Sequence, residues 1–337
     1  MVKAGKVIIT TGALPSLPPI PGIESVPHLT STTALELERL PQSLLVIGGG
    51  YIGCELGQMF ARAGVKVTIV DIVPILSAGE PEISTALGGY LREEGIVLRE
   101  GVRPTAIRET ARSIALDISA DGRSETIEAE QVLVSTGRRP NTAGLGLEEA
   151  GIELLSSGGV KVDDHMRTTR AGIYAAGDVI GRDQFVYMAA YGARIAAENA
   201  LNDDSRRYDT TAMPSVVFTD PQVASVGLTE AQAREQGLSV KTSVLPLDQV
   251  PRALAARDTR GLFKLVDEAG SGKLLGAHLL APEGADSIQT AALAIKGGLT
   301  VEQLAETIFP YLTTVEGLKL AAKSFAKDVA KLSCCAG

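Results

Sequence analysis

The six residues Gly-Gly-Gly-Tyr-Ile-Gly at positions 48–53 restrict the fold of this chain more than any other stretch. An apolar strand, 44–47, precedes them, a helical pattern continues to position 63, and a second apolar strand, 65–70, ends at Asp71. Strand, glycine-rich turn, helix and strand, with an acid roughly 20 residues beyond the turn, form the βαβ fingerprint of dinucleotide-binding domains. The sequence therefore predicts an α/β fold with a doubly wound dinucleotide-binding domain.

Three glycines of the fingerprint are each required for a different structural reason. Gly48 makes the tight turn, Gly50 leaves room for a pyrophosphate at the helix N-terminus, and Gly53 lets helix and strand pack closely. The alternative is a glycine-rich turn in some other α/β unit. The flanking strands, the helix and the distant acid count against it.

The end of the second strand bears on the choice of nucleotide. The Asp71 carboxylate is suited to accept hydrogen bonds from adenosine ribose hydroxyls and to repel a 2′-phosphate. No Lys or Arg occurs between Asp71 and Ser84 to hold such a phosphate. The pattern favours NADH over NADPH, and the alternative is that Asp71 is only a solvated strand end.

Composition excludes several classes of partner. The net charge of -8 is spread without long blocks of like charge, which argues against nucleic acid and anionic membranes, because both require clustered Lys and Arg. No apolar run approaches the roughly 20 residues of a membrane span, and no signal peptide is visible, so a cytoplasmic protein is expected. The chain has 3 cysteines, two of them neighbours, which cannot form a disulfide framework.

Three further apolar strands end in a pair of residues that includes glycine, and the residue pattern changes after about position 212. Two apolar strands end in Thr-Gly, at Gly12 and Gly137, and a third ends in Gly-Asp at Asp178. From about position 212 the sequence becomes β-rich and then helical, with a last helix expected over 315–331. Together these features resemble the flavoprotein pyridine nucleotide-disulfide oxidoreductase family, whose members have FAD- and NAD(P)-binding domains and a C-terminal α+β interface domain.

The resemblance implies four parts. These are a remnant of the FAD domain with a proline-rich connector (1–30), the NAD(P)-binding domain (31–140), the second part of the FAD domain (141–211) and the interface domain with a Cys-Cys tail (212–337). It also implies a homodimer in which each subunit completes the other's active site.

The resemblance assigns roles to residues in the FAD half. Gly12 and Gly137 correspond to the crossings between FAD and NAD domains. Asp178 corresponds to the ligand of the flavin nucleotide's ribityl chain, and Val186 to a backbone contact near the flavin.

Two fingerprint-helix residues also have counterparts in the family. Tyr51 corresponds to the lid on the nicotinamide side of the flavin, and Glu55 to the acid beside it. Local packing in the first turns of the helix is the alternative for both residues.

The segment 309–316, Phe-Pro-Tyr-Leu-Thr-Thr-Val-Glu, departs from most of the family. Most members carry a His-Pro motif followed by a glutamate, and that histidine is the acid/base for thiol exchange. Here Tyr311 stands in place of the histidine, and Glu316 follows. A phenol, with an ordinary pKa of about 10, is a poor proton shuttle at neutral pH. Ordinary dithiol substrates are therefore not expected, although Tyr311 can still lie against a metal dithiolate.

The vicinal pair Cys334-Cys335 near the end of the chain suggests soft-metal chemistry, because thiolates prefer soft cations. Together with Tyr311, the pair resembles the mercuric reductase branch of the family, which reduces Hg(II) to Hg(0) with electrons from a pyridine nucleotide passed through FAD. The resemblance implies that the pair takes Hg(II) from small thiols by exchange and delivers it to the partner subunit's active site. Two solvent-exposed thiols without a function are the alternative.

One departure concerns the family's first FAD-binding βαβ unit and its redox-active Cys-x4-Cys helix, which have no counterpart in this sequence. Cys54 lies inside the fingerprint and is expected to be a small packing residue. We therefore expect a partial chain of a larger enzyme, or one that has lost that half, with weak or no FAD binding and no Hg(II) turnover alone. The alternatives are a dihydrolipoamide-dehydrogenase-like disulfide reductase and a non-catalytic dimeric module that binds nucleotide and metal.

Overall fold

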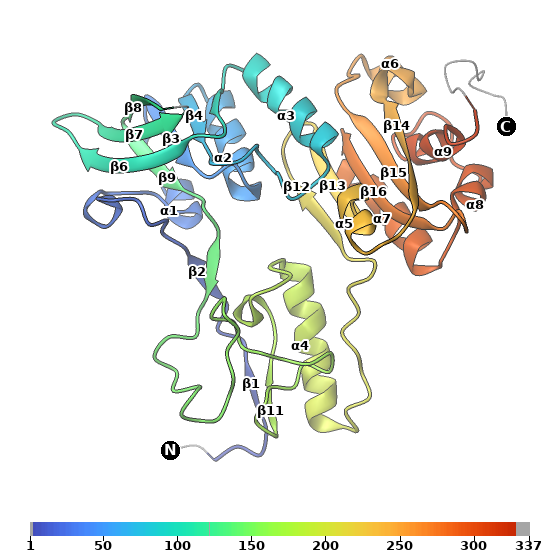
Figure 1. Cartoon of the computed structure of the whole chain (residues 1–337), viewed down its shortest axis with the longest axis horizontal. Coiled ribbons are helices and arrows are strands. Elements are labelled where there is room, and N and C mark those ends of the chain that lie inside the picture. Colours follow the sequence, from blue (N-terminus) through green and yellow to red (C-terminus); the bar gives the residue numbers. More distant parts are fainter. Residues whose placement is uncertain (1–2, 121, 328–337) are drawn as a thin grey trace. The chain divides into compact units, whose positions relative to one another are not determined.

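The computed structural model describes residues 3–120 and 122–327, which fall into two compact units (Figure 1). The first unit contains the described residues of 1–18 and 136–210, and the second those of 19–135 and 211–337. Within the described ranges, no helix has the length and apolar character needed to cross a membrane.

The nucleotide-binding part of the second unit is a parallel sheet ordered β5-β4-β3-β9. Its elements are β3 (Ser43–Ile47), α2 (Tyr51–Arg62), β4 (Lys66–Val70), α3 (Pro81–Glu93), β5 (Val97–Arg99) and β9 (Gln131–Val134). Successive side chains of a strand point to opposite faces, so Leu44 and Val46 pack on the helical side while Leu45 and Ile47 pack on the other. Burial on both faces explains the continuous apolar run of β3.

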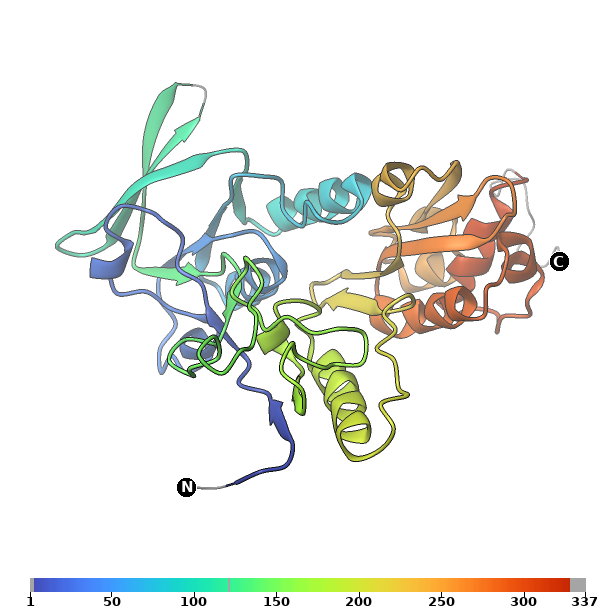
Figure 2. The same ribbon diagram turned by 60° about the horizontal axis from the view of Figure 1, so that its bottom comes forward.

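A three-stranded antiparallel meander supplies the packing on that other face (Figures 1 and 2). It consists of β6 (Arg103–Glu109), β7 (Ile114–Ala120) and β8 (Arg123–Ala129). Short elements precede the parallel sheet, namely η1 (Ile23–Ser25) and α1 (Ser31–Leu35). Thr30 closes the N-terminus of α1 in a reciprocal capping box with Thr33.

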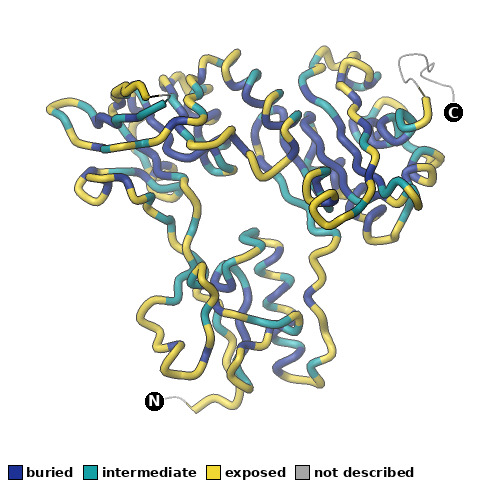
Figure 3. The backbone as a smooth tube through the Cα atoms, viewed as in Figure 1, coloured by how far each residue is buried: buried dark blue, intermediate teal, exposed yellow. Residues whose placement is uncertain are grey.

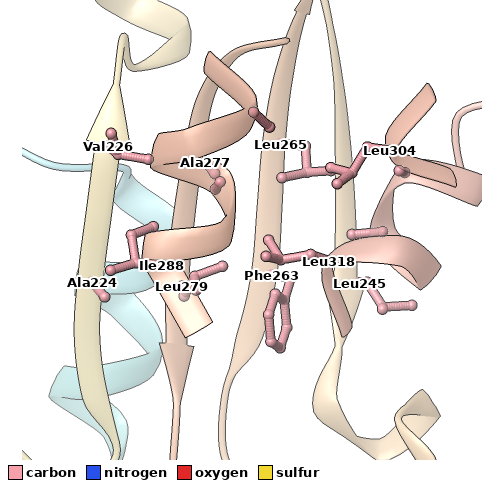
Figure 4. Packing of buried hydrophobic residues seen from close by; sticks show 14 of the residues in the cluster. Ala224, Val226, Leu245, Phe263, Leu265, Ala277, Leu279, Ile288, Leu304 and Leu318 are labelled. Atoms are coloured by element: carbon pink, nitrogen blue, oxygen red, sulfur yellow. The ribbon is translucent and has the colours of Figure 1, made fainter. Parts of the chain in front are cut away.

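The C-terminal part of the second unit is a five-stranded antiparallel sheet ordered β12-β13-β16-β15-β14. Its strands are β12 (Pro214–Val217), β13 (Gln222–Gly227), β14 (Val240–Pro246), β15 (Leu262–Glu268) and β16 (Leu274–Ala281). The helical elements are α5 (Glu230–Glu235), η3 (Leu247–Gln249), α6 (Pro251–Ala256), α7 (Gly284–Lys296), α8 (Val301–Glu306) and α9 (Glu316–Lys323). Figure 4 shows Ile288 of α7 and Leu318 of α9 packed against the sheet in one core with Phe263 and Leu279.

The first unit has two small sheets and one long helix. β1 (Val7–Ile9) pairs in parallel with β11 (Ile173–Ala175), and β2 (Ala13–Pro15) pairs antiparallel with β10 (Arg138–Pro140). The short η2 (Asp178–Ile180) follows β11, and α4 spans Val186–Leu201. Figure 3 shows the buried side of α4, which carries Met188, Gly192, Ile195, Ala196, Asn199 and Ala200.

The fold class expected from the sequence is confirmed, but two helices differ from expectation. No helix was predicted from the sequence over the residues of α4. The last helix was expected over 315–331, whereas α9 ends at Lys323 and residues 324–327 are not helical. The Ser324 hydroxyl donates to the Ala321 carbonyl at 2.9 Å, and this local bond competes with the helical pattern. The rest of the expected helix lies outside the described residues.

Candidate functional site

The fingerprint turn is closed by a backbone contact that only glycine permits. A Cβ on Gly53 would lie 1.9 Å from the Gly48 carbonyl oxygen, so α2 must start directly against the end of β3. Gly48 has φ +105°, in the region that favours glycine. A Cβ on Gly50 would meet nothing within 4 Å, and no side chain caps α2. The space over the helix N-terminus therefore suits a phosphate group.

Side-chain and backbone hydrogen bonds hold the main chain of this turn. The Asp71 Oδ2 accepts from the Gly49 N–H at 2.6 Å, and the Gly49 carbonyl accepts from the Leu76 N–H at 3.0 Å. The Ser135 hydroxyl lies 2.8 Å from the Gly48 oxygen and 3.0 Å from the Ile47 oxygen. Asp71, the residue directly after β4, thus also supports the turn. Ser135 was missed from the sequence, although a hydroxyl directly after the apolar strand β9 was the available signal.

Tyr51 and Glu55 lie on α2 and face β12 and the turn that follows it. The Tyr51 hydroxyl is 3.5 Å from the Ser215 Oγ, and the Tyr51 side chain is 40% exposed. The Glu55 Oε1 accepts from the Phe218 N–H at 2.7 Å. Burial raises the pKa of Glu55, and the Phe218 bond opposes that rise. Both residues therefore contact the C-terminal part of the second unit, more than 160 positions away in the sequence, and their roles beside a flavin stay predictions.

Cys54 is a core residue in the described structure. Its side chain is fully buried, and its Sγ donates to the Gly49 carbonyl oxygen at 3.3 Å. Burial, followed by the nearby Asp71 carboxylate, raises the pKa of the Cys54 thiol to about 12. At neutral pH the thiol is un-ionised and enclosed, as expected for a packing residue.

The predicted flavin-half residues lie in the first unit. Gly12 (φ +73°) and Gly137 (φ +107°) sit at turns beside the β2–β10 pair, where Gly12 accepts from the Asn141 N–H and Gly137 from the Ser16 N–H. Asp178 begins η2, and its Oδ2 is 3.7 Å from the Arg138 Nε.

Val186 is the first residue of α4, and its side chain is 84% exposed. No side chain caps this helix N-terminus.

The remaining predicted residues belong to the C-terminal part. Tyr311 lies in the loop before α9 and is 58% exposed, whereas Glu316 begins α9 and is 9% exposed. In the described part of the chain the Glu316 Oε2 has no hydrogen-bond partner. Cys334 and Cys335 lie outside the described residues. Among residues 3–120 and 122–327, no three His, Cys, Asp or Glu side chains gather in a way that would hold a metal ion.

Family models match most of the chain. Residues 1–197 match the model of pyridine nucleotide-disulphide oxidoreductases, and residues 213–322 match the dimerisation domain of the same proteins. The chain belongs to this family. Membership implies FAD and a pyridine nucleotide as cofactors, and the glycine-rich turn of the second unit has the form that a pyridine nucleotide requires.

Similar family members include several mercuric reductases. The chain is 50% identical to that of Staphylococcus aureus over 331 residues, which is 98% of this chain and 60% of the relative. It is 48% identical to the Streptomyces lividans enzyme, covering 100% of this chain and 71% of the relative. The Bacillus cereus enzyme is also 48% identical, with 53% of its length covered. The chain thus spans between about half and about 70% of these relatives.

Solved structures of the family have the same fold. The Cu(II) complex of the HOCl-induced flavoprotein disulfide reductase RclA from Escherichia coli matches with a TM-score of 0.87 at 33% identity, over 96% of this chain and 73% of that one. LpdA from Mycobacterium tuberculosis matches with a TM-score of 0.85 at 30% identity, over 96% and 70% of the two chains.

Replacing Gly53 by alanine tests the fingerprint contact. Because the added methyl would meet the Gly48 oxygen, we expect Gly53→Ala to weaken NADH binding by more than about tenfold and to destabilise the fold by about 1–3 kcal/mol. Titration calorimetry and thermal unfolding measure the two effects. Gly89→Ala is the control, since Gly89 lies within α3 with nothing near its Cβ position and should be neutral or slightly stabilising. Equal NADH affinity in Gly53→Ala and the wild type would contradict this account of the turn.

Alkylation tests the state of Cys54. With its pKa raised to about 12, little thiolate forms below that pH, so native Cys54 should react with iodoacetamide at least about 100-fold more slowly at pH 8 than in the unfolded chain. Peptide mass mapping follows each cysteine separately. Rapid native labelling of Cys54 would show that the helix opens or that the thiol is ionised.

Proposed function

We propose that this chain provides the pyridine-nucleotide and interface parts of a flavoprotein that reduces Hg(II) to Hg(0) with NAD(P)H. The supporting observation is 50% identity to a mercuric reductase over 98% of the chain. In the overall reaction NAD(P)H loses a hydride, two electrons convert Hg(II) to Hg(0), and one proton is released.

NAD(P)H would bind at the fingerprint turn. Its pyrophosphate fits the open space at Gly50 and the uncapped start of α2. Asp71 accepts one backbone bond on each carboxylate oxygen, from Gly49 and from Val73, and each oxygen keeps a lone pair for a ribose hydroxyl. Its negative charge disfavours a 2′-phosphate, so we propose a modest preference for NADH.

The residues present in the first unit fit FAD. Gly177 has φ +78°, and a Cβ there would lie 3.3 Å from the Ala189 Cβ, so β11 ends close to α4 as only glycine allows. Asp178 follows directly with a partly exposed carboxylate, which can accept hydrogen bonds from ribityl hydroxyls. The start of α4 at Val186 offers backbone N–H groups to an electron-rich ring edge. Bound FAD would supply two-electron transfer between nicotinamide and metal.

The vicinal thiols would handle the metal. Cys334 and Cys335 together displace two small thiols from a mercury dithiolate, releasing two free thiols and forming one chelated Hg(II). We assign the pair the delivery of Hg(II) to the partner subunit's active site. Tyr311, with its exposed ring, would lie against the metal dithiolate there, and Glu316 would orient this segment from its buried position at the start of α9.

A homodimer is part of this proposal. The matched dimerisation domain supports it, and so do apolar side chains that the described monomer leaves in solvent. Leu293 is 64% exposed, Ile308 is 93% exposed and Leu312 is 39% exposed. Covering such side chains with a second copy would remove apolar surface from water.

Mercury stoichiometry tests the role of the tail. Native mass spectrometry of the wild-type chain with limiting Hg(II) and excess small thiol should show one bound Hg(II). Cys334→Ala/Cys335→Ala should lose it, because two-coordinate thiolate binding needs both sulfurs. Cys54→Ala is the matched control and should keep it. Unchanged binding in the double variant would refute the tail's role.

Replacing Asp71 by asparagine tests nucleotide choice. The amide oxygen can still accept from the Gly49 N–H, but the negative charge is gone and the amide nitrogen cannot accept from the Val73 N–H. We expect the ratio of NADPH to NADH dissociation constants to fall by about threefold to tenfold, equivalent to about 1 kcal/mol. Competitive titration of both nucleotides provides the ratio. A ratio that is already below one in the wild type would contradict the proposed preference.

A further inference from the structure

Lys264 is a buried cation in an otherwise apolar stretch of β15. It is 1% exposed and follows Phe263, which is also fully buried. A lysine ammonium taken out of water is costly unless carboxylates surround it. The Lys264 Nζ lies 2.8 Å from the Glu80 Oε2, 2.8 Å from the Glu82 Oε1 and 3.1 Å from the Glu230 Oε2.

The three carboxylates come from two helix N-termini. Glu80 is the N-cap of α3, Glu82 lies in its first turn, and Glu230 is the first residue of α5. Carboxylates are favoured at these ends by the helix dipole. Burial alone would lower the pKa of Lys264, but the bonds to the three carboxylates outweigh burial and raise it, so the ammonium stays charged.

One further titratable group faces this cluster. His278 is paired with Lys264 across the sheet, and its Nε2 donates to the Leu228 carbonyl at 3.1 Å, 3.8 Å from the Glu80 Oε1. Burial lowers the pKa of His278, so the ring is neutral and Lys264 is the cation that balances Glu80.

Glu80 is also the end of the segment that supports the fingerprint turn. Residues 72–80 run from Asp71 to α3, and midway the Leu76 N–H donates to the Gly49 carbonyl at 3.0 Å. Ile75 presses on the same glycine, because a Cβ on Gly49 would lie 2.7 Å from the Ile75 Cγ2. Glu100 and Ser84 also hold the main chain of Ile75, so the segment is fixed at its middle to the turn and to these two residues, and at its end to Lys264.

We propose that Lys264 is a positioning residue for NAD(P)H. Through Glu80 it fixes segment 72–80 behind the fingerprint turn, so that the dimerisation domain sets the affinity of the nucleotide site. Without the ammonium, the buried Glu80 carboxylate keeps only the hydrogen bond from the Glu230 N–H to its Oε1, at 2.7 Å, and loses the cation that balances its charge. The carboxylate then moves toward water, and the segment moves with it. The proposal rests on nucleotide binding at the turn and is independent of the metal substrate.

Two glutamine variants separate positioning from general stability. Glu80→Gln weakens the cluster on the segment itself, whereas Glu230→Gln weakens it on α5, away from the segment. Both should lower the melting temperature. Only Glu80→Gln and Lys264→Met should raise the dissociation constant of NADH, by about tenfold, and the double variant should add little to Lys264→Met alone.

Hydrogen exchange provides a readout that needs no ligand. In Glu80→Gln and Lys264→Met, the amides of Gly49 and Leu76 should exchange faster, while Glu230→Gln should leave them as in the wild type. Equal effects of Glu80→Gln and Glu230→Gln on exchange and affinity would overturn the positioning role, and so would no effect of either. If the wild type fails to bind NADH, the proposed function is contradicted, and exchange still decides the role of Lys264.

Discussion

The approach of Gly53 to the Gly48 carbonyl is the contact on which the nucleotide-binding part depends. No side-chain atom fits between them, so α2 begins where β3 ends and its first amides open over Gly50. Asp71 and Ser135 then bind main-chain atoms of the turn rather than side chains. A turn held in this way is ordered before a ligand arrives, and little ordering is left for the nucleotide to impose.

Most regular elements of this part follow from local sequence. The run 44–47 is apolar at every position because both faces of β3 are covered, and glycines mark where the strand must stop. The helix α4 could not be predicted in the same way. Three of its six buried residues are glycine or alanine and one is the polar Asn199, while its exposed positions include Val186 and Leu201, which are 84% and 82% exposed. Apolar residues therefore do not mark one face of this helix, and the hydrophobic pattern does not show a period of 3.6 residues.

The part of the candidate site that could be predicted consists of residues that lie close together in the sequence. The glycines and Asp71 lie in one motif, and their spacing together with the flanking strands and helix predicts a dinucleotide site. The bond from Gly49 to Asp71 depends instead on how two strands lie side by side, which spacing does not give. Lys264 is the extreme case, since a lysine between apolar residues of a strand reads as a solvated side chain. Its partners Glu80 and Glu82 are more than 180 residues away, and only the fold reveals them.

Cys54 shows how packing in the nucleotide-binding part can keep a thiol un-ionised. Mercury binds ionised, accessible thiols, and Cys54, the one cysteine of the fingerprint helix, is neither ionised nor accessible. Burial raises the pKa of this thiol, and its hydrogen bond to the Gly49 carbonyl is one of the contacts that hold the turn. Metal at that sulfur would have to displace its hydrogen bond to the Gly49 carbonyl. The contacts that shape the nucleotide site therefore also keep the Cys54 thiol enclosed and un-ionised.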